Sequence, residues 1–307
     1  MITITDNKKK KKKRENRTFH LMLLPAVIFT AIFCYLPMCG VVIAFQDFNV
    51  AAGFFGEQIW IGWENFKFLF GLPDFWQVVF NTVYMSVFKI VIGQVVAIIV
   101  AILLSEIKSV KFKKFSQTAI YLPYFLSWVV LAGIFADMLS PSNGIVNVLL
   151  TKLGLEPIYF LGDKTWFPIT MIITDVWKGF GYGTIVYLAA ITNIPSDLYE
   201  SASIDGASRW QKIWHITLPG MRMIIVLMAL LNLGGILGAN FDQIFNMYSP
   251  QVYATGDVLD TLIYRLGLVN LQFGVSTAAG LVKSGVSMFL ISTGYYLAYK
   301  FADYKIF

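Results

Sequence analysis

Five ionisable side chains stand within long apolar stretches of this 307-residue chain and are the first candidates for chemistry. They are Lys89, Asp175, Lys178, Asp242 and Lys283. A charged group near the centre of a lipid bilayer costs several kcal/mol, so it faces protein or water. Such a residue either pairs with an opposite charge or lines a path for a polar ligand.

Spacing separates these two roles for some of the five residues. Asp175 and Lys178 lie three positions apart, on one face of a helix, and we favour mutual neutralisation over direct ligand contact. Asp242 is expected near the outer end of a span, where ordinary interface polarity would also explain it. Lys89 falls in the middle of a span. Both a counter-charge in a neighbouring helix and a role in a polar path stay open for it.

The sequence offers little for catalysis or metal binding. His20 and His215 are the only histidines, and both fall at the predicted edges of apolar segments. A zinc site or a nucleophilic Ser/His set needs such residues grouped. The sequence therefore predicts no catalytic residue and no metal site, which disfavours an intramembrane enzyme. Cys34 and Cys39 lie five positions apart and are expected to be free buried thiols, in preference to a disulfide or a metal site.

Composition identifies the environment that must hold these residues. Hydrophobic residues make up 57% and charged residues 14% of the chain, against roughly 45–50% and 25% in soluble domains. The mean hydropathy is +0.66, and the apolar blocks are long enough to cross a hydrocarbon layer of about 30 Å. The chain is thus predicted to be a polytopic α-helical integral membrane protein and not a soluble enzyme.

Apolar blocks bounded by charge, Pro and Gly predict six transmembrane helices. They are expected at about 19–46, 75–105, 115–139, 167–192, 220–246 and 275–300. The N-terminal tail, the 106–114 and 193–219 links and the C-terminus, together with Arg222, hold 17 of the 24 Lys and Arg residues. The positive-inside rule therefore places both termini in the cytoplasm. The outer links are rich in aromatic residues such as Trp60 and Trp63, and we expect them to form short helices at the interface.

The N-terminal tail, residues 1–18, is predicted to be disordered, because its six consecutive lysines at 8–13 cannot be buried. The apolar segment that follows is too long for the roughly 7–15-residue core of a secretory signal. A cytoplasmic anchor attracted to anionic lipid headgroups is favoured over a cleaved signal or a nucleic-acid arm. Residues 19–307 are expected to form a single transmembrane domain.

The cytoplasmic link at 193–219 has the pattern of two short helices joined at Gly206. Ser196 can cap the first helix, and Gly206 suits the left-handed turn that ends it. Ser208 and Gln211 have capping-box spacing for the second helix. Spacing alone leaves two readings open: an amphipathic hairpin lying on lipid, and a docking surface for another protein.

This link resembles the EAA loop of binding-protein-dependent ABC importer permeases. In that loop Glu-Ala-Ala is followed by Asp-Gly-Ala and, further on, by Ile-x-x-Pro. The matching residues here are Glu200, Ser201, Ala202, Asp205, Gly206, Ala207, Ile216 and Pro219. Ser201 replaces the first alanine, a small-for-small change that should not spoil docking.

The resemblance covers nearly the whole chain after the tail. Four segments are similar to sugar-type permeases: 62–66, 81–82, 144–147 and 187–191. The first of them contains a Gly-x-x-Asn-Phe element. Residues 241–248 and 264–268 resemble the subgroup of permeases for complex oligosaccharides.

The resemblance implies a type I ABC importer permease fold in a bacterial cytoplasmic membrane, with the EAA-like residues forming a coupling helix. No Gly-x-x-x-x-Gly-Lys-Ser/Thr phosphate loop occurs in the sequence. ATP and Mg are therefore expected on two separate cytoplasmic ATPase subunits, and this chain is expected to hold no cofactor. The other implied partners are a second, different permease subunit, an extracellular solute-binding lipoprotein and an oligosaccharide, but no nucleic acid.

A sugar path combines polar groups for hydroxyls with aromatic rings for C–H faces. Besides Asp175 and Lys178, the candidates are Trp177, Tyr182, Asn240, Phe241 and Asp242. Since Trp and Tyr in such an aromatic-rich chain mostly pack or anchor, we expect about two of these five to touch substrate.

The main alternative is a self-sufficient secondary transporter or channel. Such a protein should show inverted repeats or broken helices that carry an ion site. The sequence indicates neither.

Overall fold

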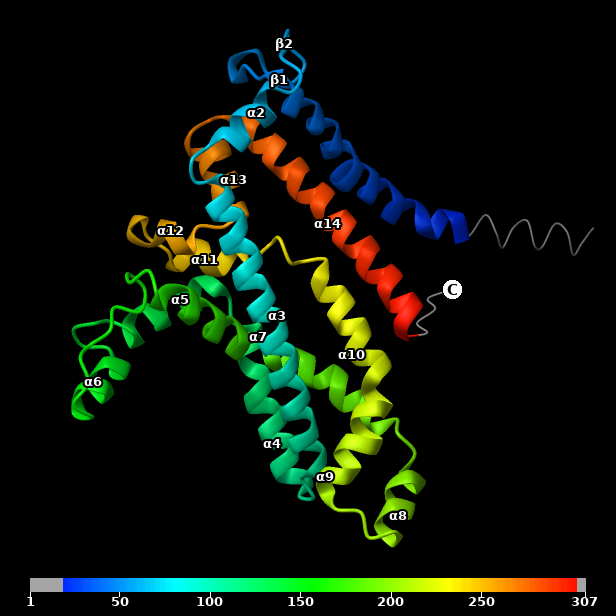
Figure 1. Cartoon of the computed structure of the whole chain (residues 1–307). Coiled ribbons are helices and arrows are strands. Elements are labelled where there is room, and N and C mark those ends of the chain that lie inside the picture. The colour runs from blue at the N-terminus through cyan, green and yellow to red at the C-terminus, as the bar shows by residue number, and fades with distance from the viewer. Residues whose placement is uncertain (1–18, 303–307) are drawn as a thin grey trace, which may run out of the picture.

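The computed structural model describes residues 19–302, which are mostly helical (Figure 1). The predicted basic tail lies outside the described residues. The first helix, Phe19–Phe45, is apolar throughout and projects away from the other helices in Figure 1. It widens to a π-helix at Ala31–Tyr35 (η1) and tightens to a 3-10 helix at Leu36–Phe45 (η2). This irregularity coincides with Pro37, which has no backbone N–H to donate.

Only the last turns of this first helix pack on the rest of the chain, against the C-terminal helix. Ala44 is buried there, whereas the large side chains before it are exposed. Cys34 and Cys39 are free thiols, as predicted, but both are exposed. The prediction that they are buried is wrong, because no residue of the first helix before Ala44 is buried within the part of the chain that the structure describes.

The link that follows this helix folds into a small cap beside its end. It contains a two-stranded antiparallel pair, β1 (Gln46–Asp47) and β2 (Ile59–Trp60), a short η3 (Val50–Ala52) and the helix α2 (Glu64–Gly71). The buried Asn65 amide donates to the carbonyl oxygens of Ala44 and Gln46 at 2.9 Å each. These bonds fasten α2 to the end of the first helix.

The centre of the molecule is a pair of long helices, α3 (Phe75–Glu106) and α7 (Trp166–Thr192), which lie side by side (Figure 1). Small residues let their backbones approach closely. A Cβ on Gly183 would lie 3.0 Å from the Ala97 Cβ. Both helices match the predicted spans within one residue at each end.

The predicted third span, 115–139, is not one helix. α4 (Val110–Tyr121) and η4 (Leu122–Phe125) are followed by α5 (Trp128–Met138) at a bend of 101°. Pro123 lies in η4, and the Ser127 hydroxyl caps α5 by accepting from the Val130 N–H. A cap inside an apolar block starts a new helix there. The lobe after α5 contains the short α6 (Ile145–Lys152).

The predicted fifth span, 220–246, is wrong at both ends. A helix that can cross a membrane runs over Arg209–Leu233 and consists of α9 (Arg209–Lys212), the π-helix η5 (Ile213–Thr217) and α10 (Leu218–Leu233). The chain then leaves the helical path at 234–240, where Gly234, Gly235 and Gly238 occur, and α11 (Phe241–Met247) follows as a separate helix. Glycine weakens a helix interior.

The remaining elements follow α11 and lead into the last span. They are η6 (Pro250–Val252), α12 (Tyr253–Gly256), α13 (Leu259–Tyr264), η7 (Arg265–Val269) and α14 (Phe273–Ala302). Two ion pairs fix this region: the Arg265 guanidinium contacts Asp257 at 2.5 Å, and Lys283 on α14 pairs with Asp260 on α13.

Four described helices are long and apolar enough to cross a membrane: Phe19–Phe45, Phe75–Glu106, Arg209–Leu233 and Phe273–Leu297. The bent pair of α4 and α5 makes a fifth candidate if it is counted as one span. α7 is about 40 Å long at 1.5 Å per residue, but Asp175 and Lys178 make it less apolar. The protein is therefore a helical multi-pass membrane protein.

Candidate functional sites

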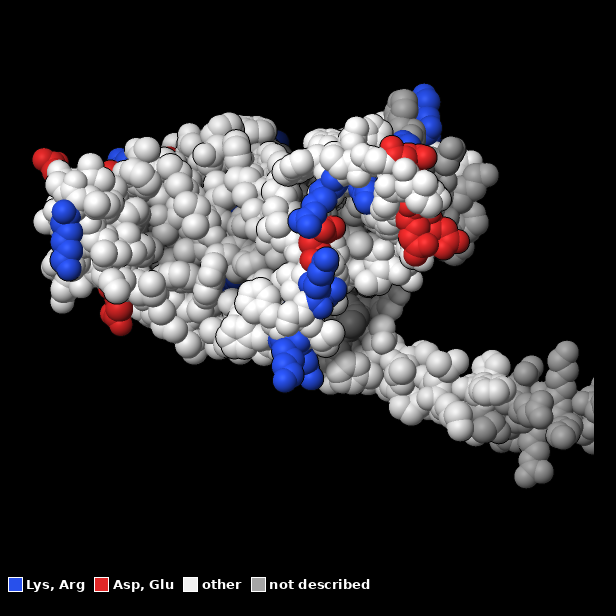
Figure 2. All heavy atoms as spheres, turned by 90° about the horizontal axis from the view of Figure 1, so that it is seen from below, with Lys and Arg blue, Asp and Glu red and all other residues white. Residues whose placement is uncertain are grey.

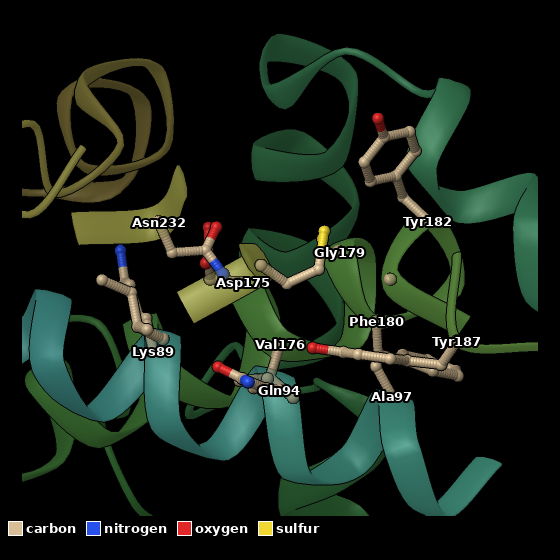
Figure 3. A pocket seen from close by; sticks show the side chains of 14 residues that line it. Lys89, Gln94, Ala97, Asp175, Val176, Gly179, Phe180, Tyr182, Tyr187 and Asn232 are labelled. Atoms are coloured by element: carbon tan, nitrogen blue, oxygen red, sulfur yellow. The ribbon is translucent and has the colours of Figure 1, made fainter. Parts of the chain in front are cut away.

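A cavity of about 210 Å³ lies between α3, α7 and α10 (Figure 3). Its wall combines polar groups with aromatic rings. The polar and aromatic residues that line it are Lys89, Gln94, Asp175, Phe180, Tyr182, Tyr187 and Asn232. Asp175 and Tyr182, both predicted from the sequence, are thus brought to one surface.

Asp175 is hydrogen-bonded to the non-helical segment that follows α10. Its carboxylate Oδ1 accepts a hydrogen bond from the Asn240 Nδ2 at 2.6 Å. Asn240 has a left-handed φ of 62° and directly precedes α11. The structure therefore joins two predicted residues that are 65 positions apart.

Lys178 does not neutralise Asp175, so the predicted pairing is wrong. The Lys178 Nζ instead donates to the Tyr124 carbonyl oxygen at 3.1 Å. It also lies 5.3 Å from the ring centre of Tyr124 and 5.4 Å from that of Trp128. The bend between α4 and α5 explains this choice, because it brings a carbonyl oxygen and two ring faces to α7.

The other aromatic and acidic candidates differ in position. Tyr182 stacks on Tyr124, with ring centres 5.1 Å apart. Trp177 meets Phe135 edge-on at 5.7 Å and is not among the residues that line the cavity.

Phe241 and Asp242 are both on α11 and also lie outside the cavity lining. Phe241 packs on Phe245 and Tyr264, and Asp242 is exposed. The expectation that Asp242 ends the fifth span is wrong, because that span stops at Leu233.

Lys89 is buried, with a relative exposure of 7%. Its Nζ donates to the Ala239 carbonyl oxygen at 2.9 Å and to the Gln243 Oε1 at 2.5 Å. Its direct partners are therefore neutral oxygens and not a counter-charge.

Sequence analysis missed Gln94, Asn232, Gln243 and Tyr187. For the first three, a polar amide within an apolar block is a usable signal. Tyr187 begins the 187–191 segment that resembles sugar-type permeases, but its residue type did not single it out, since the chain contains 15 tyrosines.

The 193–219 link contains the predicted first helix, α8 (Ser196–Ile204). Gly206 has a left-handed φ of 78°, and the Ala207 N–H donates to the Ala202 carbonyl oxygen at 2.8 Å, which closes the helix end. The predicted capping box of Ser208 and Gln211 is present.

Two details of the predicted link are wrong. Ser196 is the first residue of α8, and Pro195 stands at its cap. The second helix is not separate either, because it continues from Arg209 into the fifth span.

Most residues of α8 and of the turn that follows it are exposed. Glu200, Ser201, Asp205 and Gly206 are exposed, while Ala202 and Ala207 are half-buried. Ile204 is 87% exposed. Viewed from below, acidic and basic side chains gather over part of the lower surface, with broad uncharged areas around them (Figure 2).

Two hydrogen bonds tie α8 to the base of the fifth span. The Tyr199 and Thr217 hydroxyls lie 3.0 Å apart, and the Lys212 Nζ donates to the Ser203 hydroxyl at 2.6 Å. At its other end, α10 carries Asn232 to the cavity. Among residues 19–302, no group of three or more His, Cys, Asp or Glu side chains could hold a metal ion.

Comparison with known proteins gives consistent matches. The family of binding-protein-dependent transport system inner membrane components matches residues 93–241. Protein LplB of Bacillus subtilis is 35% identical over 96% of this chain and 92% of its own length. The polygalacturonan/rhamnogalacturonan transport system permease protein YteP of the same organism is 37% identical over 98% and 95%.

A solved structure is similar over the same extent. In the crystal structure of a bacterial ABC transporter involved in the import of the acidic polysaccharide alginate, one chain is 37% identical to this one. The TM-score is 0.88, and the match covers 96% of this chain and 99% of that chain. The family match at 93–241 includes the α7 wall of the cavity and all of α8. With full-length relatives at this level of identity, the chain belongs to the family of binding-protein-dependent transport system inner membrane components.

Proposed function

We propose that this chain is a permease subunit of an ATP-driven importer that takes up carbohydrate of the oligosaccharide class from an extracellular solute-binding protein. The cavity between α3, α7 and α10 carries this proposal. It sets Asp175, which is bonded to Asn240, on the same wall as the rings of Tyr182 and Tyr187. Carboxylate and amide groups suit sugar hydroxyls, and ring faces suit sugar C–H groups.

The size of the cavity supports a pathway shared with a second permease subunit. At about 210 Å³ it is smaller than the roughly 300–1,000 Å³ of complete small-molecule pockets. A surface that holds part of a ligand needs a facing wall. Relatives whose names refer to polygalacturonan/rhamnogalacturonan and to galactooligosaccharides support the carbohydrate class. We propose that a different permease chain supplies that wall and forms a heterodimer with this chain.

For topology, we propose six crossings with both termini in the cytoplasm. α7 then counts as a span in spite of its charges, and the bent pair of α4 and α5 counts as another. Residues 19–307 form the permease domain, and residues 1–18 its cytoplasmic tail. Under this orientation α8 and its turn face the cytoplasm, where Glu200, Ser201, Ala202, Asp205, Gly206 and Ala207 dock on one of two ATPase subunits that bind ATP and Mg.

A self-sufficient secondary transporter is the competing class, and one structural feature favours it. The bent pair of α4 and α5 is a broken span, and broken helices are typical of secondary transporters. Family membership favours the ATP-driven class. The chain alone in liposomes should move no sugar under a proton or sodium gradient, and uptake in that assay would support the secondary transporter instead.

The direct test uses the complete complex of both permeases, both ATPases and the solute-binding protein in liposomes. We expect ATP hydrolysis to rise when the binding protein is loaded with the right oligosaccharide from a panel of neutral and uronate-containing chains. Stimulation by no sugar, with stimulation by another solute class, would contradict the carbohydrate assignment.

A further inference from the structure

The segment between the end of the fifth span at Leu233 and α11 contains a left-handed turn formed by two residues that are not glycine. Ala239 and Asn240 have φ values of 40° and 62°. Side chains other than glycine rarely occupy this region, so the surrounding structure has to hold them there. The turn matters because Asn240 reaches Asp175 from it.

One contact on this turn comes from α3. The Lys89 ammonium donates to the Ala239 carbonyl oxygen at 2.9 Å, within the turn, and to the Gln243 Oε1 at 2.5 Å, in the first turns of α11. Lys89 is buried, although it also lines the cavity, so water has little access to these bonds. Hydrogen bonds from a charged donor are stronger than neutral ones, and a buried ammonium that lost them would be unsatisfied.

A second set of contacts comes from α7. The fully buried Gln243 donates from its Nε2 to the Met171 carbonyl oxygen at 2.7 Å and to the Thr174 hydroxyl at 2.8 Å. Its amide therefore bonds α3 through the oxygen and α7 through the nitrogen. Thr174 directly precedes Asp175, so the same stretch of α7 receives both Gln243 and Asn240.

We propose that Lys89 and Gln243 are positioning residues that clamp the left-handed turn at Ala239 and Asn240 between α3 and α7. The clamp places the Asn240 amide on the Asp175 carboxylate and so fixes the polar wall of the cavity. Its role in transport rests on the proposed function of that cavity. Its role in holding the turn can be measured without any sugar.

The test replaces Lys89 by methionine, which keeps the length of the side chain and removes its donors. In the complete complex in nanodiscs, backbone amide hydrogen exchange at 238–244 should accelerate at least tenfold, since the turn loses its buried donor. Exchange in α8 should stay unchanged. Ser86→Ala is the matched control: Ser86 lies on α3, is buried, and its hydroxyl has no hydrogen-bond partner among residues 19–302. It should leave exchange at 238–244 unaltered.

A double-mutant cycle separates a clamp from ordinary packing. Gln243→Met should also accelerate exchange at 238–244, and adding it to Lys89→Met should cost much less than the sum of the two changes, because the residues act as one unit. Additive effects, or exchange that rises equally along α3 and α7, would overturn the inference. So would unchanged exchange at 238–244 in Lys89→Met.

Sugar uptake by the same variants distinguishes the two proposals. Uptake that falls at least tenfold together with faster exchange supports both the clamp and the pathway. Faster exchange at 238–244 with normal uptake would support the clamp and contradict the assignment of the cavity to the sugar path.

Discussion

At the scale of single residues, side chains of similar chemistry on one helix have different surroundings. Tyr182 and Trp177 both belong to α7, and their exposures are 50% and 43%. Tyr182 lines the cavity and stacks on Tyr124, whereas Trp177 packs against Phe135 outside the lining. Residue type alone does not show which of the two rings lines the cavity. The bend between α4 and α5 makes the difference, because it brings Tyr124 against Tyr182.

This difference gives a matched pair of variants. Tyr182→Leu should lower sugar uptake by the complete complex about tenfold, or roughly 1.4 kcal/mol, because the ring face for a sugar is lost. Trp177→Leu should leave uptake within about twofold of the parent protein, since it removes a packing contact away from the cavity. Equal losses in both variants would contradict the assignment of Tyr182.

The turn after α8 allows a second matched pair. Gly206 and Gly154 have nearly the same left-handed φ, 78° and 79°, and open space for a side chain. A valine at either position adds strain of about 1–3 kcal/mol. Only Gly206→Val should abolish uptake and reduce co-purification of the ATPase, because only that turn belongs to the proposed coupling surface.

Gly154→Val, in the outer lobe after α6, should keep ATPase association and serves as the strain control. The alternative reading of the 193–219 link, a hairpin that lies on lipid, predicts normal uptake for both variants. Near-normal transport by Gly206→Val at equal expression would remove the coupling role from this loop.

At the scale of helices, apolar blocks located the spans but did not show where spans break. The predicted second and fourth spans agree closely with α3 and α7. α7 stays continuous although it contains Gly179, Gly181 and Gly183, so glycines alone do not predict a break. The third and fifth spans break at Ser127 and at the glycines after Leu233. Those local signals were present in the sequence. The contacts of Lys89 and Asn240 across the break were not, since they join residues 150 and 65 positions away.

The crossing of α4 and α7 yields a prediction at the scale of helices. A Cβ on Gly181 would lie 2.4 Å from the Ile120 carbonyl oxygen, so Gly181→Ala must push the two helices apart. We expect a loss of stability of about 1–3 kcal/mol, seen as a lower melting temperature of the complex in detergent. Gly133→Ala on α5 has open space around its Cβ and should not destabilise the protein. Equal melting temperatures would show that α4 does not pack here.

At the scale of the whole molecule, the proposed orientation separates two exposed surfaces. Phe55 in the first outer link is 97% exposed, and Ser203 on α8 is also exposed. After replacement of Cys34 and Cys39, which are exposed free thiols, a cysteine introduced at Phe55 should react with an impermeant maleimide in intact cells. A cysteine at Ser203 should react only after the cells are opened. Labelling of Ser203→Cys from outside would reverse the topology.

The helix Arg209–Leu233 connects α8 to the cavity wall and can act as a rigid lever between them. Its lower end is bonded to α8 through Thr217 and Lys212, and its upper end carries Asn232 to the cavity wall. The arm from Arg209 to Asn232 is about 35 Å long, so a tilt of about 5° at the base moves the far end by about 3 Å. A stroke of that length would open or close a hydrogen bond to a ligand. Force on α8 therefore needs no chain of side-chain rearrangements to reach the cavity, because the backbone of one helix carries it.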